Sequence, residues 1–175
     1  MTIAGSDDIP IATTSDLFVN LRQSLLQFGD PNQSIQLAVR QLKLLVISAN
    51  VRVLPDYLWE TVESKIRAAL LEGFSFAQRE LGQDAFASEA VSMIQAQEGV
   101  AYVYLNKFDA VAEDTTAEEL ANLSNSFGLQ PRVLVNKARI NPKATDPAKR
   151  ILPAQLAYLS PAVADTLILN PEPSR

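Results

Sequence analysis

The stretch Leu45-Val46-Ile47-Ser48-Ala49-Asn50-Val51-Arg52-Val53 decides the fold, because its side chains alternate in character along the chain. The odd-numbered residues are all apolar, whereas Ser48, Asn50 and Arg52 are polar. Alternation with a period of two is typical of a half-buried β-strand, whose successive side chains point to opposite faces of the sheet. We therefore predict a strand over Leu42–Leu54 with one apolar face and one more polar face.

The residues before this strand also alternate. Within Ser34–Gln41, the apolar residues Ile35, Leu37 and Val39 share one side, which again predicts a half-buried strand. No strong turn signal separates the two stretches. Two arrangements stay open: one long bent strand, or two strands joined by a tight corner.

An amphipathic helix is predicted after the strand. Pro55 ends the strand, and Asp56 is a suitable N-cap because its carboxylate can accept amide hydrogens of the first helical turn. Gly73 is a suitable C′ residue after the last turn. The apolar stripe that should lie on the sheet consists of Leu58, Val62, Ile66 and Leu70. Trp59, beside this stripe, is interpreted as a packing residue rather than a platform for a ligand.

A second helix follows after an ordered excursion. Phe74–Gln83 contains two phenylalanines, Arg79 and a glycine turn, and its structure is harder to predict. Ser88 is then predicted to cap the second helix, which carries Glu89 in its first turn. Gly99 is predicted to close this helix.

The next segment, Val100–Leu105, is rich in β-branched and aromatic residues and predicts a strand. Tyr102 and Tyr104 would share one face of this strand, and Val103 and Leu105 the other. Since both faces are apolar or aromatic, we expect both to be at least partly covered.

The N-terminal region predicts a loose segment and then a helix. Residues 1–13 are interpreted as a flexible arm, and Ser15 or Asp16 can cap a helix that ends at Gly29. Its residues at helical spacing are Leu17, Leu21, Leu25 and Phe28. We expect this helix to pack on its own domain, with docking on a partner as the alternative.

The C-terminal third predicts short elements. Thr115 and Glu118 form a capping-box pattern at the start of a short helix. Residues 137–150 are polar and basic and predict an exposed loop, with a patch that docks an acidic surface as the alternative. The predicted strands are Pro131–Val135, Leu152–Leu159 and Thr166–Asn170. A single α+β domain over residues 14–170 and a loose tail over residues 171–175 are expected.

Composition limits the function. Hydrophobic residues make up 47% of the 175 residues, which is enough for a core, and the formal net charge of −5 argues against wholesale nucleic-acid binding. The chain has neither cysteine nor histidine, so the commonest metal ligands and general bases are missing. No apolar run is long enough to span a membrane. We predict no catalytic, cofactor or metal residues and no enzymatic activity.

Several segments together resemble the C-terminal region of the baseplate J-like proteins, also called baseplate assembly proteins. The matching segments follow in the expected order from about residue 17 to residue 170. They include Leu45–Tyr57 with Trp59-Glu60, Phe74-Ser75-Phe76 with Arg79 and Leu81-Gly82-Gln83, Ser88-Glu89 with Ile94-Gln95, Gly99–Val103, Ile151–Leu156 and Asp165–Asn170.

This resemblance implies a structural role in the baseplate wedge of a contractile injection system or phage-tail-like particle. The implied partners are other wedge and hub proteins, with self-association and without nucleic acid. The implied location is the cytoplasm, within a particle that is later released or anchored. Family members are usually much longer, so we expect the chain to be a fragment or the product of a divided gene. The family offers no catalytic residues to carry over.

The expected architecture is an α+β fold built on a split strand–helix–helix–strand unit, compatible with a ferredoxin-like arrangement, with extra C-terminal strands and an N-terminal helix. Because aromatic residues and arginine are enriched at interaction hot spots, six residues are interface candidates. They are Trp59, Phe74, Phe76, Arg79, Tyr102 and Tyr104. The alternatives are a small-molecule-binding regulatory domain on a ferredoxin-like scaffold and an enzyme that uses carboxylates alone.

Overall fold

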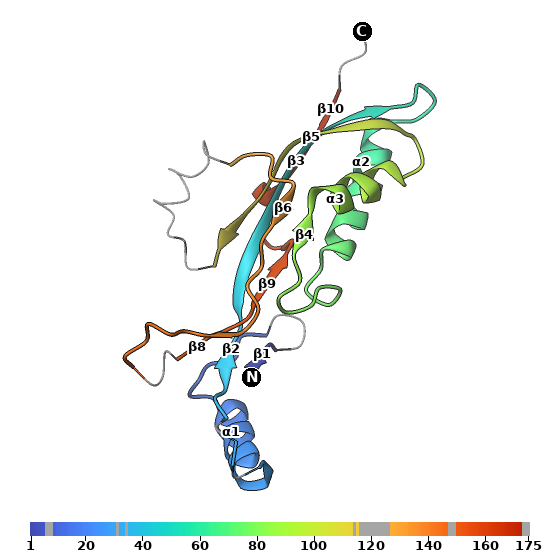
Figure 1. The fold of residues 1–175 in the computed structure, drawn as a ribbon. Coiled ribbons are helices and arrows are strands. Elements are labelled where there is room, and N and C mark those ends of the chain that lie inside the picture. The colour runs from blue at the N-terminus through green and yellow to red at the C-terminus, as the bar shows by residue number, and fades with distance from the viewer. Residues whose placement is uncertain are drawn as a thin grey trace.

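A computed structural model describes residues 1–5, 9–30, 32–33, 35–113, 115, 127–146 and 150–172. Strand β3 (Gln41–Val53) runs along the centre of an elongated molecule, and helices α2 (Trp59–Gly73) and α3 (Ala87–Gln95) cover one side of its sheet (Figure 1). Helix α1 (Asp16–Phe28) lies at the end of the molecule remote from strand β10 (Leu167–Pro171). The predicted α+β class is confirmed.

The main sheet is three strands wide. Strand β3 pairs antiparallel with β5 (Val100–Ala112) along one edge. Along its other edge it pairs in parallel with β9 (Gln155–Tyr158) and then with β10. The second strand of the central unit is longer than predicted, because β5 stays paired with β3 as far as Ala112. Both α2 and α3 lie in the single connection between β3 and β5, whereas a ferredoxin-like βαββαβ order has one helix in each of two connections.

A β-bulge in β5 reverses the alternation of its side chains. Leu105 pairs with Ala49 and Lys107 pairs with Ser48, so Asn106 is an extra residue between two paired positions. Both Leu105 and Phe108 therefore face the helices, although they are three residues apart. This local change in period hides the full length of β5 from a simple reading of alternation.

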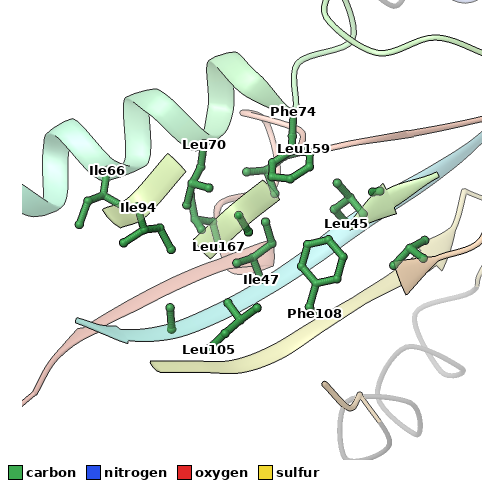
Figure 2. Packing of buried hydrophobic residues seen from close by; sticks show 14 of the residues in the cluster. Leu45, Ile47, Ile66, Leu70, Phe74, Ile94, Leu105, Phe108, Leu159 and Leu167 are labelled. Carbon is green, nitrogen blue, oxygen red and sulfur yellow. The ribbon is translucent and has the colours of Figure 1, made fainter. Parts of the chain in front are cut away.

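The core lies between the sheet and the two helices. The alternation predicted for β3 is confirmed, because its odd-numbered residues from 45 to 51 have no exposed surface. Figure 2 shows how Ile66 and Leu70 of α2 and Ile94 of α3 point toward Ile47 of β3 and Phe108 of β5. Three of the four predicted stripe residues of α2 are buried, while Leu58 lies outside the helix and is exposed.

The N-caps predicted for α2 and α3 are both wrong. Asp56 does not cap α2, because Pro55 and Asp56 lie in a turn in which the Tyr57 amide donates to the Leu54 carbonyl oxygen at 3.0 Å. Ser88 lies inside α3, whose N-cap is Phe86, although Glu89 does accept the Phe86 amide at 3.0 Å. The Glu89 carboxylate in the first turn thus caps α3, in place of the predicted Ser88.

Two glycines have roles that differ from those predicted. Gly73 is the last residue of α2 rather than the residue after it, and a Cβ atom there would lie 2.5 Å from Met93 Cε of α3. Gly99 does not close α3, which ends at Gln95; it has φ +92° and leads into β5. The first glycine allows two helices to approach, and the second allows a left-handed turn.

The segment Phe74–Gln83, which follows α2, runs along the edge of β9 that does not pair with β3. The Leu159 amide donates to the Phe74 carbonyl oxygen at 2.8 Å, and the Gly82 amide donates to the Gln155 carbonyl oxygen at 2.8 Å. Phe74 belongs to the main core. Phe76, two residues later, packs against a second buried cluster formed by Leu42, Leu156 and Tyr158.

The N-terminal region forms two short strands and a capped helix. Strand β1 (Thr2–Ile3) pairs in parallel with β2 (Ala38–Val39), so residues 1–13 are not a wholly unpaired arm. Within the described part of the predicted strand Ser34–Gln41, Ala38–Val39 forms β2 and Gln41 is the first residue of β3, with Arg40 between the two strands. Of the two arrangements left open, two separate strands is correct. Ser15 caps α1 as predicted, accepting from the Phe18 amide.

The remaining elements are short and lie at the margins of the sheet. Strand β4 (Ala85–Phe86) pairs with β6 (Arg132–Val133), and β7 (Arg139–Ile140) pairs with β8 (Ile151–Leu152). The predicted basic loop therefore carries one strand of a small ribbon. The predicted C-terminal strands correspond to β8, β9 and β10, with a 3-10 turn over Ala164–Thr166. The helix predicted from Thr115 falls, beyond Thr115 itself, outside the described residues.

Candidate interaction surfaces

The six interface candidates divide by their exposure. Phe74 and Arg79 are buried within the fold, so their prediction as surface anchors is wrong. Phe76 and Trp59 are half-buried against the two hydrophobic clusters. The remaining two, Tyr102 and Tyr104, are 49% and 63% exposed and are available to a partner.

Arg79 is buried because it joins the excursion to α3. Its guanidinium donates to Glu89 Oε2 at 3.2 Å and to the Asp84 carbonyl oxygen, and it lies 5.5 Å from the centre of the Phe74 ring. The same Glu89 oxygen accepts the Phe86 amide. One carboxylate thus caps α3 and neutralises a buried cation, which is a structural role.

Tyr102 and Tyr104 lie on the side of the sheet opposite the helices. In the antiparallel register, Tyr102 pairs with Arg52 and Tyr104 with Asn50. Two residues of β10, Ile168 and Asn170, extend the same face, since they pair with Ser48 and Asn50. We call this the tyrosine face; it comprises Asn50, Arg52, Tyr102, Tyr104, Ile168 and Asn170.

The coverage expected for both faces of β5 is therefore only partly correct. The face with Val103 and Leu105 lies against the helices, whereas the two tyrosines and Ile168 are exposed. The centre of this sheet side is better covered, because Val46 and Ser48 are buried. Sequence reasoning missed the approach of Arg52 to Tyr102, since fifty positions separate them in the chain. The polar face predicted for β3 already contained Arg52. Only the strand register shows that Tyr102 lies beside it.

Helix α1 forms a second exposed surface. Its only buried residue is Phe18, and Leu21 and Leu25 are half-buried. The four exposed apolar residues are Leu17 at 60%, Val19 at 40%, Leu26 at 60% and Phe28 at 80%. The expectation that the predicted stripe packs on the domain is wrong for Leu17 and Phe28. We call Leu17, Val19, Leu26 and Phe28 the α1 surface.

A polar cluster links the ends of α2 and α3 at the surface. The Tyr57 hydroxyl donates to Glu98 Oε1 at 3.0 Å, and Lys65 Nζ lies 3.4 Å from Glu98 Oε2. The hydrogen bond from Tyr57, followed by that from Lys65, lowers the pKa of Glu98, and the same bond to Glu98 raises the pKa of Tyr57. All of these groups are engaged with one another, so the cluster is a surface brace between elements.

A hollow of about 410 Å³ lies where β3, β5 and β9 meet and bears on the small-molecule alternative. Gln41, Glu113 and Gln155 supply its polar lining. The two amides are already engaged, because Gln155 donates to Gln41 at 3.4 Å and accepts the Asn136 amide at 3.1 Å. The hollow therefore does not present the convergent polar groups that fix a ligand.

In the part of the chain that the structure describes, no three acidic, histidine or cysteine side chains are placed to hold a metal ion. Among the same residues no helix is both long and apolar enough to cross a membrane. No protein-family model matches the sequence, and no curated protein matches it significantly.

Proposed function

We propose that this chain is a non-enzymatic structural assembly module that acts through protein–protein contacts. The observation that carries the proposal is the α1 surface. A helix with one buried residue and four exposed large apolar residues gains little from its own domain. Leu17 and Phe28 lie on the same side of the helix, since eleven positions are close to three full turns, and large apolar residues exposed in this way mark sites of protein interaction.

The length of α1 strengthens this argument. The helix has 13 residues, and isolated helices of about 12–15 residues are marginal in water because helix nucleation is costly. Most helical stability in proteins comes instead from packing of the apolar face. Full burial of one large apolar side chain contributes about 1.5–3 kcal/mol. A partner groove that covers Leu17 and Phe28 would therefore stabilise both the helix and the complex.

The tyrosine face supports a second contact. Tyrosine and arginine are enriched among the residues that dominate binding energy, and Tyr102, Tyr104 and Arg52 lie together on this face. It lies on the sheet, whereas the α1 surface lies at one end of the molecule (Figure 1). Two separate contact surfaces suit a component that joins more than one neighbour.

The resemblance to baseplate J-like proteins suggests the assembly in which these surfaces act. We propose the baseplate wedge of a contractile injection system or phage-tail-like particle, with wedge and hub proteins as partners and further copies of this chain as neighbours. The particle would form in the cytoplasm and then be released or anchored. A small-molecule-binding regulatory domain is less well supported, because the two side-chain amides that line the hollow at β3, β5 and β9 are already hydrogen-bonded within the chain.

Hydrogen exchange of the dilute, monomeric chain tests the role of α1 directly. We expect the backbone amides of α1 to exchange at least tenfold faster than those of α2, because only a bound partner would complete the packing of α1. Equal protection of the two helices in the monomer would show that α1 needs no partner and would overturn the proposal. The double variant Leu17→Ser/Phe28→Ser should leave α2 exchange unchanged, as should the matched control Gln23→Ser/Gln27→Ser.

The proposed location needs a second experiment. Contractile particles purified from cells that produce the chain would be labelled with gold-conjugated antibody against it and viewed by electron microscopy. We expect label at one end of each particle, where a baseplate lies. Particles that consistently lack the chain would refute the baseplate assignment while leaving the exchange result to judge the assembly role.

A further inference from the structure

We propose that the outer edge of β5 pairs with the same edge of a second copy, with the two strands antiparallel about a two-fold axis at Val103. The sheets of the two copies would then form one continuous sheet, in a contact that closes as a dimer. This inference rests on the proposed assembly function and names a second copy as one partner. It does not involve the α1 surface, so the two proposals can fail separately.

The outer edge of β5 is open along its first half. Strand β3 lies between β5 and β10 (Figure 2), and among the described residues no strand pairs with the outer side of β5 before Phe108. At Phe108 the edge is occupied, because its amide donates to the Gly128 carbonyl oxygen and its carbonyl oxygen accepts the Gln130 amide, both at 3.0 Å. The open stretch therefore comprises residues 100–106, and Gly99, at φ +92°, turns the chain at its other end.

This stretch directs hydrogen-bonding groups outward. The Leu54 amide donates to the carbonyl oxygen just before β5 at 2.9 Å, so the even-numbered residues of β3 bond toward β5. Val103 and Leu105 lie opposite odd-numbered residues of β3, and their N–H and C=O groups therefore point away from it. The Ala101 carbonyl oxygen accepts Gln95 Nε2 of α3 at 3.2 Å, and a carbonyl oxygen has a second lone pair for a partner.

The centre of the open stretch places the axis. Residues 100–106 are centred on Val103, and an axis there gives two antiparallel copies their longest overlap before they meet residues 128–130. Val103 would exchange two amide-to-carbonyl hydrogen bonds with Val103 of the second copy. The Leu105 amide of each copy would donate to the Ala101 carbonyl oxygen of the other. The register shifts beside Ala101 and Asn106 leave residues 102–105 regularly paired with β3.

The side chains at this junction suit a second copy. In the proposed register Tyr102 of one copy lies directly opposite Tyr104 of the other, and paired aromatic residues stabilise adjacent strands. Residues 100–106 contain no charged residue, although the chain carries a formal charge of −5. The exposed residues of α3, which contacts β5, are also uncharged: Ser88, Ser92 and Gln95. Neither the paired strands nor these α3 residues would bring like charges together.

The opposite edge of the sheet is protected against such pairing. In β10 the Leu167 carbonyl oxygen accepts Arg67 Nη1 at 3.3 Å, and Pro171 has no amide hydrogen to donate. Proline and charged side chains commonly protect edge strands from pairing with other chains. Residues 100–106 of β5 include neither, and the stretch is rich in β-branched and aromatic residues. The open edge of β5 is thus the one suited to strand addition.

Light scattering of the whole chain over a concentration series tests the pairing. We expect the unmodified chain to pass from monomer to dimer, and Val103→Pro to lower the association constant at least tenfold. Proline removes the amide on the axis, which the ladder with β3 does not use. Ala112→Pro is the matched control and should dimerise like the unmodified chain. Ala112 is exposed in the same strand and also lies opposite an odd-numbered residue, but beyond the open stretch.

Charge variants at the two exposed tyrosines test the register without proline. Tyr102→Lys/Tyr104→Glu places opposite charges across the axis and should still dimerise. Tyr102→Lys/Tyr104→Lys places like charges directly opposite each other and should lower the association constant at least tenfold. Equal association of these two variants would exclude the register and overturn the inference.

A cross-link tests the position of the axis. The chain has no cysteine, so Val103→Cys adds a single thiol. Its Cα atom would lie about 5.5 Å from that of the second copy, which is within reach of a disulfide. Mild oxidation should convert Val103→Cys to a covalent dimer and leave Ala112→Cys monomeric on a non-reducing gel. Equal cross-linking of the two variants would contradict an axis at Val103.

Two further results would overturn the inference. The first is an unmodified chain that stays monomeric at every concentration, and the second is Val103→Pro that dimerises as well as Ala112→Pro. Association that survives in Val103→Pro would place the contact between copies on another surface, such as the α1 surface. A monomeric chain would leave the α1 proposal standing, since that depends on the exchange measurement.

Discussion

The Arg79 guanidinium and the Glu89 carboxylate form an ion pair at 3.2 Å in which the two partners differ in exposure. The Arg79 side chain is only 4% exposed, whereas that of Glu89 is 33% exposed. Glu89 also accepts the amide at the start of α3. The pair therefore joins α3 to the segment Phe74–Gln83, which runs along the edge of β9. Its removal should affect folding rather than binding.

Arg79→Ala is expected to lower the free energy of unfolding by about 2–3 kcal/mol. Loss of one partner from a buried pair costs more, about 3–5 kcal/mol, but Glu89 retains contact with water. Arg79→Lys should restore little, since lysine cannot reproduce the forked donors of arginine. Urea denaturation would measure these values. Arg132→Ala, which removes a surface pair with Asp84, is the control and should cost less than about 1 kcal/mol; equal losses in the two variants would contradict the prediction.

Deletion of Asn106 is expected to be tolerated. Removal of the bulge residue leaves Leu105 paired with Ala49 and Lys107 with Ser48, so every other side chain keeps its face. The main loss is the hydrogen bond from Asn106 to Asn50, about 0.5–1.5 kcal/mol. Thermal unfolding followed by circular dichroism would report the change.

Deletion of Tyr104 from the same strand is the matched comparison. It would turn Leu105 away from the helices and turn Asn106 toward them, because a shift of one residue exchanges the two faces. We expect a loss of about 3–5 kcal/mol, comparable to truncating a buried apolar residue. If both deletions are equally harmful, the bulge assignment is wrong.

Gly99→Ala should destabilise the chain by about 1–3 kcal/mol. At φ +92° any other residue is strained, and the added Cβ would lie 2.7 Å from Tyr57 Cδ1 and 2.9 Å from Val62 Cγ2. Gly128→Ala is the control, since its nearest neighbour would be at an ordinary 3.7 Å. Chemical denaturation of both variants would show a loss only for Gly99→Ala; an unchanged midpoint there would reject the strain argument.

The surface cluster predicts a pH effect. The hydrogen bond from Tyr57 and the neighbouring Lys65 hold the pKa of Glu98 below its ordinary value of 4.5. Since the folded pKa is lower than the unfolded one, the stabilising contribution is present above pH 4.5 and is lost as the pH falls through the folded pKa. NMR titration of the Glu98 carboxyl carbon should show its pKa rise in Tyr57→Phe. Tyr104→Phe, on the other face of the molecule, should leave that titration unchanged.

The elements that sequence reasoning predicts correctly are those with a local physical cause. The alternation in β3 and the four-residue repeat in α2 record which side of each element is buried. The Ser15 cap of α1 depends only on the amide three residues later. The errors at Asp56 and Ser88 are also local, since Asp56 lies in a turn closed by the Tyr57 amide and α3 begins before Ser88, where Glu89 accepts the Phe86 amide.

The sequence by itself thus determined the α+β class, the central strand, the order of the strand–helix–helix–strand unit, and the core-facing residues of β3. Only the tertiary structure decided that Phe74 and Arg79 are internal, that Arg52 lies beside Tyr102, and that Leu17 and Phe28 remain exposed. Periodicity shows which residues share the apolar side of an element. Whether these residues are buried depends on which distant segment packs against them. For β3 the covering segments are α2 and α3; for Leu17 and Phe28, the described part of the chain leaves the greater part of each side chain uncovered.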